Sequence, residues 1–332
     1  MSKNIVYSLF LVFVLMGVFG LAFRVQRVEA SGTIYIRYNG LVEGTDKITN
    51  ANNITYTFTD NINDSIVVER SNIMIDGAGY TFQGSGSENG FLLWGISNTT
   101  IRNADIKGFE VGVYIGSASK NIISQNNITE NYYGITLWSA SNNSIFGNNI
   151  SWNDHIGINA YDSCNHNIIS GNNLTDNVYT AIGFARSSNN SIIGNNIINS
   201  TYGFYHSSSN DNTMTGNNIT ENSYGIELYN STYNSVYHNR FENNTVQVVC
   251  RENSTNFWDD GSEGNYWSDY EQKYPSASEI GNTGIWDTPY VIDADNTDHY
   301  PVVPEFPSLI ILPLFMIATL LAVIVYRRKH TI

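Results

Sequence analysis

The chain is poor in cysteine, proline and strong helix formers, and these shortages narrow the class of fold. Only two cysteines and six prolines occur in 332 residues, so disulfides do not hold this fold together. Ala, Leu, Lys and Glu are sparse, which argues against a compact helical domain. The chain has 46 Asn and 22 Tyr instead, with 42% hydrophobic residues. This composition favours a β protein with many turns.

Positive charge is also scarce. Residues 31–307 contain 10 Lys and Arg against 29 Asp and Glu, a net charge of −19. A surface of this sign repels phosphate backbones and anionic lipid headgroups. The balance therefore excludes a nucleic-acid-binding function.

The N-terminal end is apolar and predicts export. Residues 5–23 form an uncharged apolar run behind Lys3, and Val28-Glu29-Ala30 resembles a small-residue cleavage site. We predict a secretory signal peptide over residues 1–30. An uncleaved anchor is the alternative, because the apolar run is long for a signal.

The C-terminal end predicts a membrane anchor. Residues 309–326 are apolar and precede the basic residues Arg327, Arg328 and Lys329. A run of this length can cross a bilayer, and its basic flank is expected on the cytoplasmic side. Residues 31–307 are therefore expected outside the cell, anchored at its surface.

An internal repeat determines the predicted fold. Asn-Asn followed by an aliphatic residue recurs every 22–24 residues, and in the last copy Arg and Phe take the second and third places. Apolar residues within each copy alternate with period two, as in strands. Three short strands per repeat leave no room for a crossover helix, so we predict an all-β, right-handed parallel β-helix of about eight coils. The first Asn of each copy is Asn126, Asn148, Asn172, Asn195, Asn217 or Asn239.

We interpret this column of Asn as structural rather than as a set of ligands. At the turns of stacked coils, an Asn amide can donate to one neighbouring coil and accept from the other, and Asn tolerates the left-handed backbone. The next residue in four copies begins an Asn-x-Ser/Thr sequon and is expected to point outward. These candidate glycosylation sites are Asn127, Asn149, Asn173 and Asn218.

The ends of the repeat predict two caps. We assign residues 31–53 to an N-terminal cap and residues 54–254 to the repeats. Residues 255–303, which include three Trp, form a C-terminal cap. Residues 304–332 hold a sorting signal, the transmembrane helix and a basic tail. Caps are expected because the terminal coils of a solenoid have no neighbour on one side.

Several motifs resemble those of a known family. They are Asp76-Gly77-Ala78-Gly79-Tyr80, the Asn-Asn-Ile-Thr-Glu-Asn copies at 126 and 217, Asn265-Tyr266-Trp267-Ser268-Asp269-Tyr270 and Asp287-Thr288-Pro289-Tyr290. Together they look like the NosD-like parallel β-helix proteins. That family is named for a periplasmic copper-binding protein and shares its repeat with carbohydrate-binding and sugar-hydrolase domains. The resemblance covers about residues 54–301 and implies the fold more strongly than a function.

A second resemblance concerns the tail. Pro304-Glu305-Phe306-Pro307, just before the apolar run, looks like the PEF-type C-terminal sorting signal of archaeal surface proteins. It implies an archaeosortase as a partner and, after cleavage, a lipid-linked protein.

The sequence predicts no metal site and no cofactor. Where similar proteins carry an Asp-rich loop suited to calcium, residues 278–287 offer only Glu279 and Asp287, so calcium has weak support. Copper sites need Met and Cys or clustered His. No two Met are close, and His155, His166, His206 and His238 fall in four different repeat columns.

Three carboxylates are the candidates for catalysis. Glu130, Asp176 and Glu221 recur on every second coil, which should place them ~10 Å apart. Paired carboxylates of sugar hydrolases lie ~5–9.5 Å apart. A solvated turn edge explains these residues better, so no catalytic function is assigned.

Outward aromatic residues are the candidates for ligand binding. Trp138, Tyr161 and Tyr229 share one predicted outward column, and Tyr114 and Tyr205 lie one column over. Aromatic rings beside Asn, Ser and Glu suit stacking on sugars, although aromatic residues are also ordinary strand formers. We therefore predict a surface β-helix that binds glycans or has a structural role. A polysaccharide hydrolase or lyase and a copper-delivery factor are the alternatives.

Overall fold

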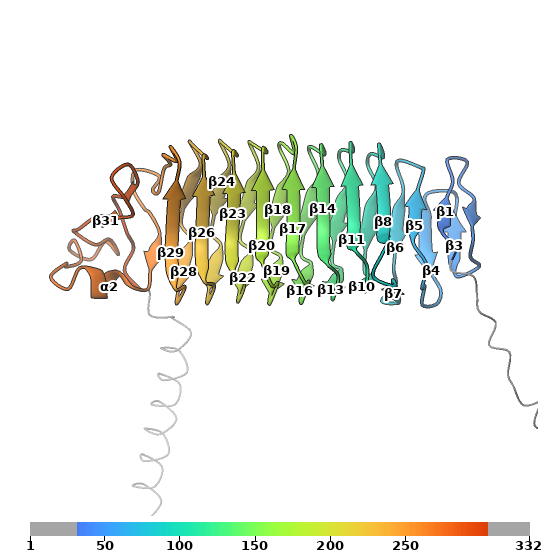
Figure 1. Cartoon of the computed structure of the whole chain (residues 1–332), viewed down its shortest axis with the longest axis horizontal. Coiled ribbons are helices and arrows are strands. Elements are labelled where there is room, and N and C mark those ends of the chain that lie inside the picture. The colour runs from blue at the N-terminus through green and yellow to red at the C-terminus, as the bar shows by residue number, and fades with distance from the viewer. Residues whose placement is uncertain (1–31, 305–332) are drawn as a thin grey trace, which may run out of the picture. The chain divides into compact units, whose positions relative to one another are not determined.

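The computed structural model describes residues 32–304. These residues form a right-handed parallel β-solenoid, which confirms the predicted fold (Figure 1). The predicted signal peptide and transmembrane helix lie outside the described residues. Within residues 32–304, no helix has the length and apolar character needed to cross a membrane.

The coils form three long sheets, which we call sheets A, B and C. Over residues 74–251, each coil contributes one strand to each sheet, in the chain order B, C, A. Sheet A has 11 strands, and its pairings are parallel except that of β1 with β2. In spatial order its strands are β2 (Val42–Glu43), β1 (Ile34–Ile36), β5 (Ile66–Val68), β8 (Asn89–Trp94), β11 (Val111–Gly116), β14 (Tyr133–Trp138), β17 (Ile156–Tyr161), β20 (Thr180–Ala185), β23 (Tyr202–Ser207), β26 (Tyr224–Tyr229) and β29 (Val246–Arg251).

Sheets B and C are built from shorter strands. Sheet B contains β3 (Ile48–Ala51), β4 (Thr55–Phe58), β6 (Met74–Asp76), β9 (Thr100–Arg102), β12 (Ile122–Ser124), β15 (Ser144–Phe146), β18 (Ile168–Ser170), β21 (Ser191–Ile193), β24 (Thr213–Thr215) and β27 (Ser235–Tyr237). Sheet C contains β7 (Thr81–Gln83), β10 (Asp105–Lys107), β13 (Asn127–Thr129), β16 (Asn149–Ser151), β19 (Asn173–Thr175), β22 (Asn196–Ile198), β25 (Asn218–Thr220), β28 (Arg240–Glu242) and β30 (Tyr266–Trp267).

The solenoid has about ten turns rather than the predicted eight. Strand β1 already pairs in parallel with β5, in the register Ile34↔Ile66 and Ile36↔Val68. The predicted count began near residue 54 and included the coil of Ile66 and Val68, but it assigned residues 31–53 to a cap. The parallel pairing of β1 shows that the solenoid already begins within that segment.

The central residue of each three-residue strand in sheets B and C points inward and is buried. In sheet C this inward column includes Ile128, Ile150 and Leu174, which are neighbours in register. Neighbouring strands of the coil meet at corners where one residue adopts a positive φ. Gly171 (φ 58°) does so between β18 and β19, where no side chain has to be accommodated.

The six Asn of the predicted ladder hydrogen-bond in series through the interior. Asn172 donates from Nδ2 to Asn195 Oδ1 (3.0 Å) and to the carbonyl oxygen of Ile145 (2.9 Å). Its Oδ1 accepts the backbone N–H (3.0 Å) and the Nδ2–H (2.9 Å) of Asn148. The amide thus satisfies polar groups of both neighbouring coils where water is absent.

The ladder predicts a test of stability. Asn172→Ala leaves Asn148 N–H and the Ile145 carbonyl buried without these partners, so we expect a loss of roughly 2–4 kcal/mol of unfolding free energy. Asn196→Ala is the control: Asn196 is half-buried and bonds Asn173 and Asn218 at 2.7 Å, where water can replace it. It should cost under about 1 kcal/mol. Chemical denaturation of both variants measures the difference, and equal losses would contradict this role of the inner ladder.

A C-terminal cap closes the last coil. It contains α2 (Tyr270–Lys273), β31 (Tyr290–Val291) and β32 (Thr297–Asp298), seen at the orange-red end of Figure 1. The Trp267 ring stacks between Phe241 (4.3 Å) and Tyr290 (4.3 Å) and covers the end of the core.

The cap also terminates the ladders. Asn296 Oδ1 accepts the backbone N–H of Asn256 (3.0 Å), and Asp298 Oδ2 accepts that of Asn265 (2.8 Å). One short segment therefore supplies the final acceptor for two columns of Asn.

Candidate ligand-binding face

The predicted aromatic residues lie on the outer face of sheet A but do not form one continuous column. Trp138 and Tyr161 are neighbours in register on β14 and β17. Tyr229 lies three coils beyond Tyr161, with Ala185 and Ser207 between them. The structure thus brings together Trp138 and Tyr161 and leaves Tyr229 apart.

The second predicted column is also divided. Tyr114 and Tyr205 share the fourth position of their strands but lie four coils apart, with Thr136, Asn159 and Gly183 between them. Tyr114 lies near Trp138 and Tyr161, whereas Tyr205 belongs to another group of rings further along sheet A.

Trp94 on β8 completes the first group and was missed by the sequence analysis. Its ring stacks on Trp138 (centroids 5.2 Å apart, planes at 25°) and lies parallel to that of Tyr114 (6.3 Å, 9°). Gly116 stands between Trp94 and Trp138 in the register, and a Cβ there would lie 2.6 Å from the Trp94 ring. The sequence could have indicated this contact, because Trp94, Gly116 and Trp138 all occupy the sixth position of their strands.

A groove runs beside these rings across β11, β14 and β17. Its volume is about 470 Å³. Rings, hydroxyls, amides and one carboxylate line it, and no Lys or Arg is among its eight described lining residues. These are Asn89, Glu110, Val111, Tyr114, Tyr133, Thr136, Asn159 and Tyr161.

Two tyrosines of the groove, Tyr114 and Tyr133, remain protonated. Burial, followed by the hydrogen bond and charge of the neighbouring Tyr161 hydroxyl, raises the pKa of Tyr114 above its usual value. Burial is also the main cause that raises the pKa of Tyr133. Both hydroxyls can therefore donate and accept hydrogen bonds at neutral and mildly alkaline pH.

A hydrogen bond and an ion pair hold the Trp138 edge of this group of rings. Trp138 Nε1 donates to Asp162 Oδ2 (3.2 Å), and Arg186 contacts Asp162 Oδ1 (2.6 Å). The hydrogen bond from Arg186 is the main cause that lowers the pKa of Asp162. Arg186 is thus already paired with a carboxylate and fixes the indole of Trp138 indirectly.

A second line of rings runs along the edge of sheet A where its strands begin. Tyr132, His155, Tyr179, Tyr202 and Tyr224 follow one another with centroids 5.0–5.3 Å apart. Burial lowers the pKa of His155, so this imidazole is neutral at pH 7. The face therefore offers aromatic and uncharged polar groups over several coils.

The candidate catalytic carboxylates do not meet. Glu130, Asp176 and Glu221 occupy the corner after sheet C, each at a positive φ of 56–57°. Trp152 and Asn199 take the same corner on the coils between them. Asp176 Oδ1 accepts from Asn199 Nδ2 (2.6 Å), so this carboxylate bonds an amide rather than a second carboxylate.

The imidazoles are similarly dispersed. His206 lies in the core and His155 directly precedes β17, whereas His238 contacts Asp260 (3.3 Å) and Glu263 (3.6 Å) beside the cap. Across residues 32–304, no three His, Cys, Asp or Glu side chains group closely enough to hold a metal ion.

The four candidate glycosylation sites form an outer ladder. Asn149, Asn173 and Asn218 each donate from Nδ2 to the Oδ1 of the Asn on the previous coil, at 2.7–2.9 Å. Asn127 donates to Asp105 (2.6 Å). Because a glycan is attached at this nitrogen, modification there would disturb the ladder.

The comparisons with known proteins bear on the family and the fold. The family model described as "Periplasmic copper-binding protein (NosD)" matches residues 24–184 and 67–272, which together span most of the chain. No curated protein matches significantly.

Solved structures similar to this chain are β-helix proteins of low identity. The mannuronan C-5 epimerase AlgE6 A-module of Azotobacter vinelandii has 16% identity and a TM-score of 0.48, over 64% of this chain and 70% of that one. The periplasmic alginate epimerase AlgG has 16% identity and a TM-score of 0.45, over 61% of this chain. DFA-IIIase from Arthrobacter chlorophenolicus A6 has 17% identity and a TM-score of 0.43, over 66% of this chain and 60% of that one.

The matched region spans about half of AlgG, at 49% of its length. The family model, by contrast, matches far more than half of this chain and agrees with the repeat and the solenoid. The chain belongs to the NosD family of parallel β-helix proteins.

Proposed function

We propose that the outer face of sheet A binds an uncharged glycan outside the cell. The observation that carries this proposal is the groove beside Trp138 and Tyr161, which combines half-buried rings with tyrosine hydroxyls, amides and one carboxylate. Sugars are recognised by rings that cover their apolar faces and by polar groups that bond their hydroxyls.

The charge of the face favours a neutral ligand over a uronic-acid polymer. The groove residues include Glu110 and no cation, and Arg186 is paired with Asp162. The net charge of −19 over residues 31–307 would also repel a polyanion.

Binding fits the groove better than hydrolysis. Glycosidases use two carboxylates that flank the bond to be cleaved. Glu110 is the one carboxylate among the described groove residues, and the corner residues Glu130, Asp176 and Glu221 lie outside it. A polysaccharide hydrolase or lyase therefore has less support, as does copper delivery, because the described His residues do not cluster.

The proposal includes anchoring at the cell surface. The family is periplasmic by its description, which agrees with export. The apolar run 309–326 would then hold the solenoid at the membrane, with or without cleavage by an archaeosortase. Fractionation of cells expressing the full chain or a chain ending at residue 303 tests this, and equal release of both would contradict it.

The glycan proposal predicts a binding loss on sheet A. In the double variant Trp138→Ala/Tyr161→Ala, two ring contacts worth about 1 kcal/mol each disappear, so we expect roughly thirtyfold weaker glycan binding. The matched control is Phe146→Ala, an exposed aromatic (41%) on sheet B. An array of neutral and acidic glycans, probed with the full chain in detergent, supplies the ligand and the affinities.

Two outcomes would contradict the proposal. The first is the absence of any neutral glycan ligand on the array. The second is an equal loss in the double variant and in Phe146→Ala, which would indicate a general effect of removing aromatic surface rather than a site on sheet A.

A further inference from the structure

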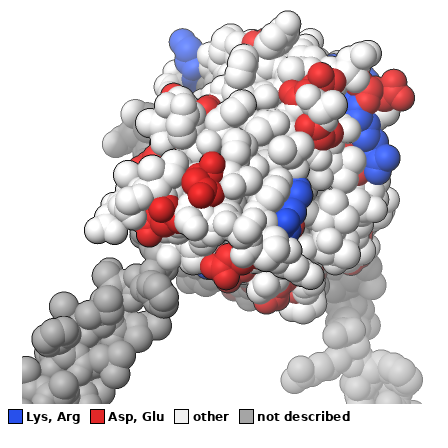
Figure 2. Space-filling model, turned by 90° about the vertical axis from the view of Figure 1, so that its left-hand side faces the viewer, with Lys and Arg blue, Asp and Glu red and all other residues white. Residues whose placement is uncertain are grey.

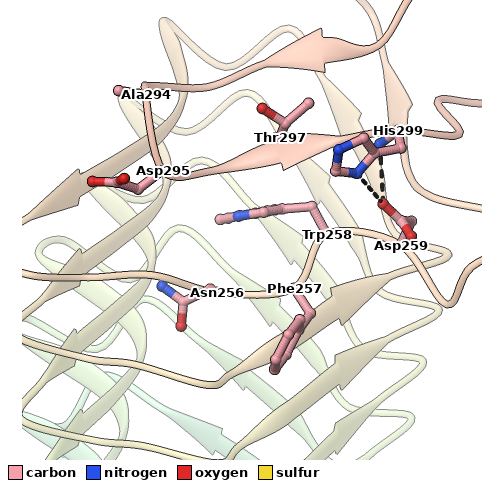
Figure 3. Close-up of a pocket in the computed structure, with 8 residues that line it drawn as sticks. All are labelled: Asn256, Phe257, Trp258, Asp259, Ala294, Asp295, Thr297 and His299. Atoms are coloured by element: carbon pink, nitrogen blue, oxygen red, sulfur yellow. Dashed lines mark hydrogen bonds and ion pairs between the residues drawn. The ribbon is translucent and has the colours of Figure 1, made fainter.

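A second pocket, distinct from the sheet A groove, lies where the C-terminal cap meets the last coil (Figure 3). We call it the cap pocket; its volume is about 400 Å³. It forms between residues 256–259 and 294–299, which Asn296 holds together. Asn296 Oδ1 accepts both the backbone N–H of Asn256 (3.0 Å) and Trp258 Nε1–H (3.1 Å).

One wall of the cap pocket is aromatic and open to solvent. Phe257 is 55% exposed, and its neighbour Tyr233 on the previous coil is 61% exposed. The two ring centroids are 6.4 Å apart. Trp258, by contrast, is buried and serves as the floor. Large aromatic side chains exposed beside a pocket are typical of ligand-binding surfaces.

The opposite side is polar and has a defined geometry. The backbone N–H of His299 donates to Asp259 Oδ2 (3.0 Å), and His299 Nδ1 contacts the same oxygen (3.1 Å). These two contacts fix the imidazole, and its Nε2 faces the cavity (Figure 3). An imidazole held this way presents a directed hydrogen-bonding group to a ligand.

The charge of the cap pocket is negative. Asp295 is exposed at the other side of the cavity from His299 (Figure 3). The eight residues that line the cap pocket include two aspartates and neither Lys nor Arg. Figure 2, which views this end of the molecule, shows separate acidic groups on a surface with few basic ones. The pocket therefore disfavours anions and favours a ligand with positive charge.

We propose that the cap pocket binds a hexosamine that carries a free ammonium group. The apolar face of the pyranose would cover Phe257, the ammonium would pair with Asp295, and a hydroxyl would bond His299 Nε2. A monosaccharide or disaccharide fits a cavity of this size. This site is independent of the groove on sheet A, because none of its lining residues belongs to that sheet.

Titration calorimetry of the full chain in detergent tests the inference, with glucosamine, glucose and glucuronate as probes at pH 7 and low salt. We expect glucosamine to bind at least fivefold more tightly than glucose, and glucuronate to bind most weakly. Asp295→Asn should remove the preference for glucosamine over glucose, because it removes the carboxylate that pairs with the ammonium. Phe257→Ala should weaken binding of both sugars at least fivefold.

Matched variants separate this site from the sheet A face. Phe146→Ala and Trp138→Ala/Tyr161→Ala should leave glucosamine affinity unchanged. Equal affinity for glucose and glucosamine, or unchanged binding in Asp295→Asn, would overturn the proposal. Loss of glucosamine binding in Trp138→Ala/Tyr161→Ala would also overturn it and move the site to sheet A.

Discussion

Replacement of His206 by leucine should stabilise the solenoid and remove a large part of its sensitivity to acid. His206 occupies an inward position of β23 and is completely buried. Neither ring nitrogen has a hydrogen-bond partner, and the ring packs edge-on against Phe184 (5.0 Å) and Phe204 (6.3 Å). A buried polar group without a partner costs about 1–3 kcal/mol, so leucine should raise the unfolding free energy by that amount at pH 7.

The acid effect follows from the pKa of this imidazole. Burial lowers the pKa of His206 from 6.5 to about 3. Below pH 6.5 the unfolded chain binds a proton that the folded chain does not bind. Protonation of this residue therefore costs no unfolding free energy above pH 6.5. As the pH drops from 6.5 towards 3, the unfolding free energy falls by about 1.4 kcal/mol per pH unit. The total loss from this residue is on the order of 5 kcal/mol.

Denaturation of the wild type and His206→Leu at several pH values between 3 and 7.5 measures this effect. The stability difference between them should grow as the pH falls. Leucine fits the site, because Leu228 fills the same column on the next coil. Phe204→Leu, a nearby core change with no titratable group, is the control and should differ from the wild type by the same amount at every pH. A constant difference for His206→Leu as well would contradict the argument.

Loss of the Asp298 carboxylate should detach the C-terminal cap. Asp298 is fully buried. Its Oδ2 accepts from Asn265 N–H (2.8 Å) and Trp267 Nε1–H (2.8 Å), and its Oδ1 accepts from Tyr300 N–H (3.1 Å). Asp298→Ala leaves these donors without their acceptor, at about 1–3 kcal/mol each when they stay buried. We expect a loss of roughly 3–6 kcal/mol.

A graded series separates the hydrogen bonds from the volume of the side chain. Asp298→Asn can keep an oxygen towards Asn265 and Trp267 and lose only the bond to Tyr300, so its loss should be roughly 1–2 kcal/mol. Asp295→Ala, an exposed aspartate of the same segment, should stay within about 0.5 kcal/mol. Burial raises the pKa of Asp298 to about 6, so denaturation at pH 8 compares the variants with the ionised wild type. Equal losses in all three would contradict the capping role.

The repeat shows how far sequence reasoning reaches. Asn172 and its counterparts recur with aliphatic residues at constant offsets, and each offset corresponds to one face of one strand. The predicted fold and the inward columns are confirmed for this reason. The number of coils was wrong because residues 31–53 were assigned to a cap, whereas Ile34–Ile36 already pairs in parallel with Ile66–Val68.

The sheet A face was only partly predictable. The outward direction of Trp138 and Tyr161 follows from strand alternation. The sequence analysis missed Trp94 because it defined the repeat from Asn126 onward. The coil that contains Asn126 contributes β14 to sheet A, two coils after the strand of Trp94. The stacking of Trp94 on Trp138 depends on the missing side chain of Gly116, and a periodic pattern does not report such a gap.

By itself, the sequence determined the family, the solenoid and the composition of its faces, because a periodic chain can satisfy its hydrogen bonds only by stacking equivalent positions. Only the tertiary structure decided where the chain departs from that periodicity. Asn296 and Asp298 accept hydrogen bonds from the last Asn of two ladders, which lie 40 and 33 residues earlier in the sequence. His299 donates to Asp259, which also lies 40 residues earlier. The closing segment lies outside the repeat, so no internal offset aligns these partners. Their pairing depends on which buried donors the last coil leaves without an acceptor.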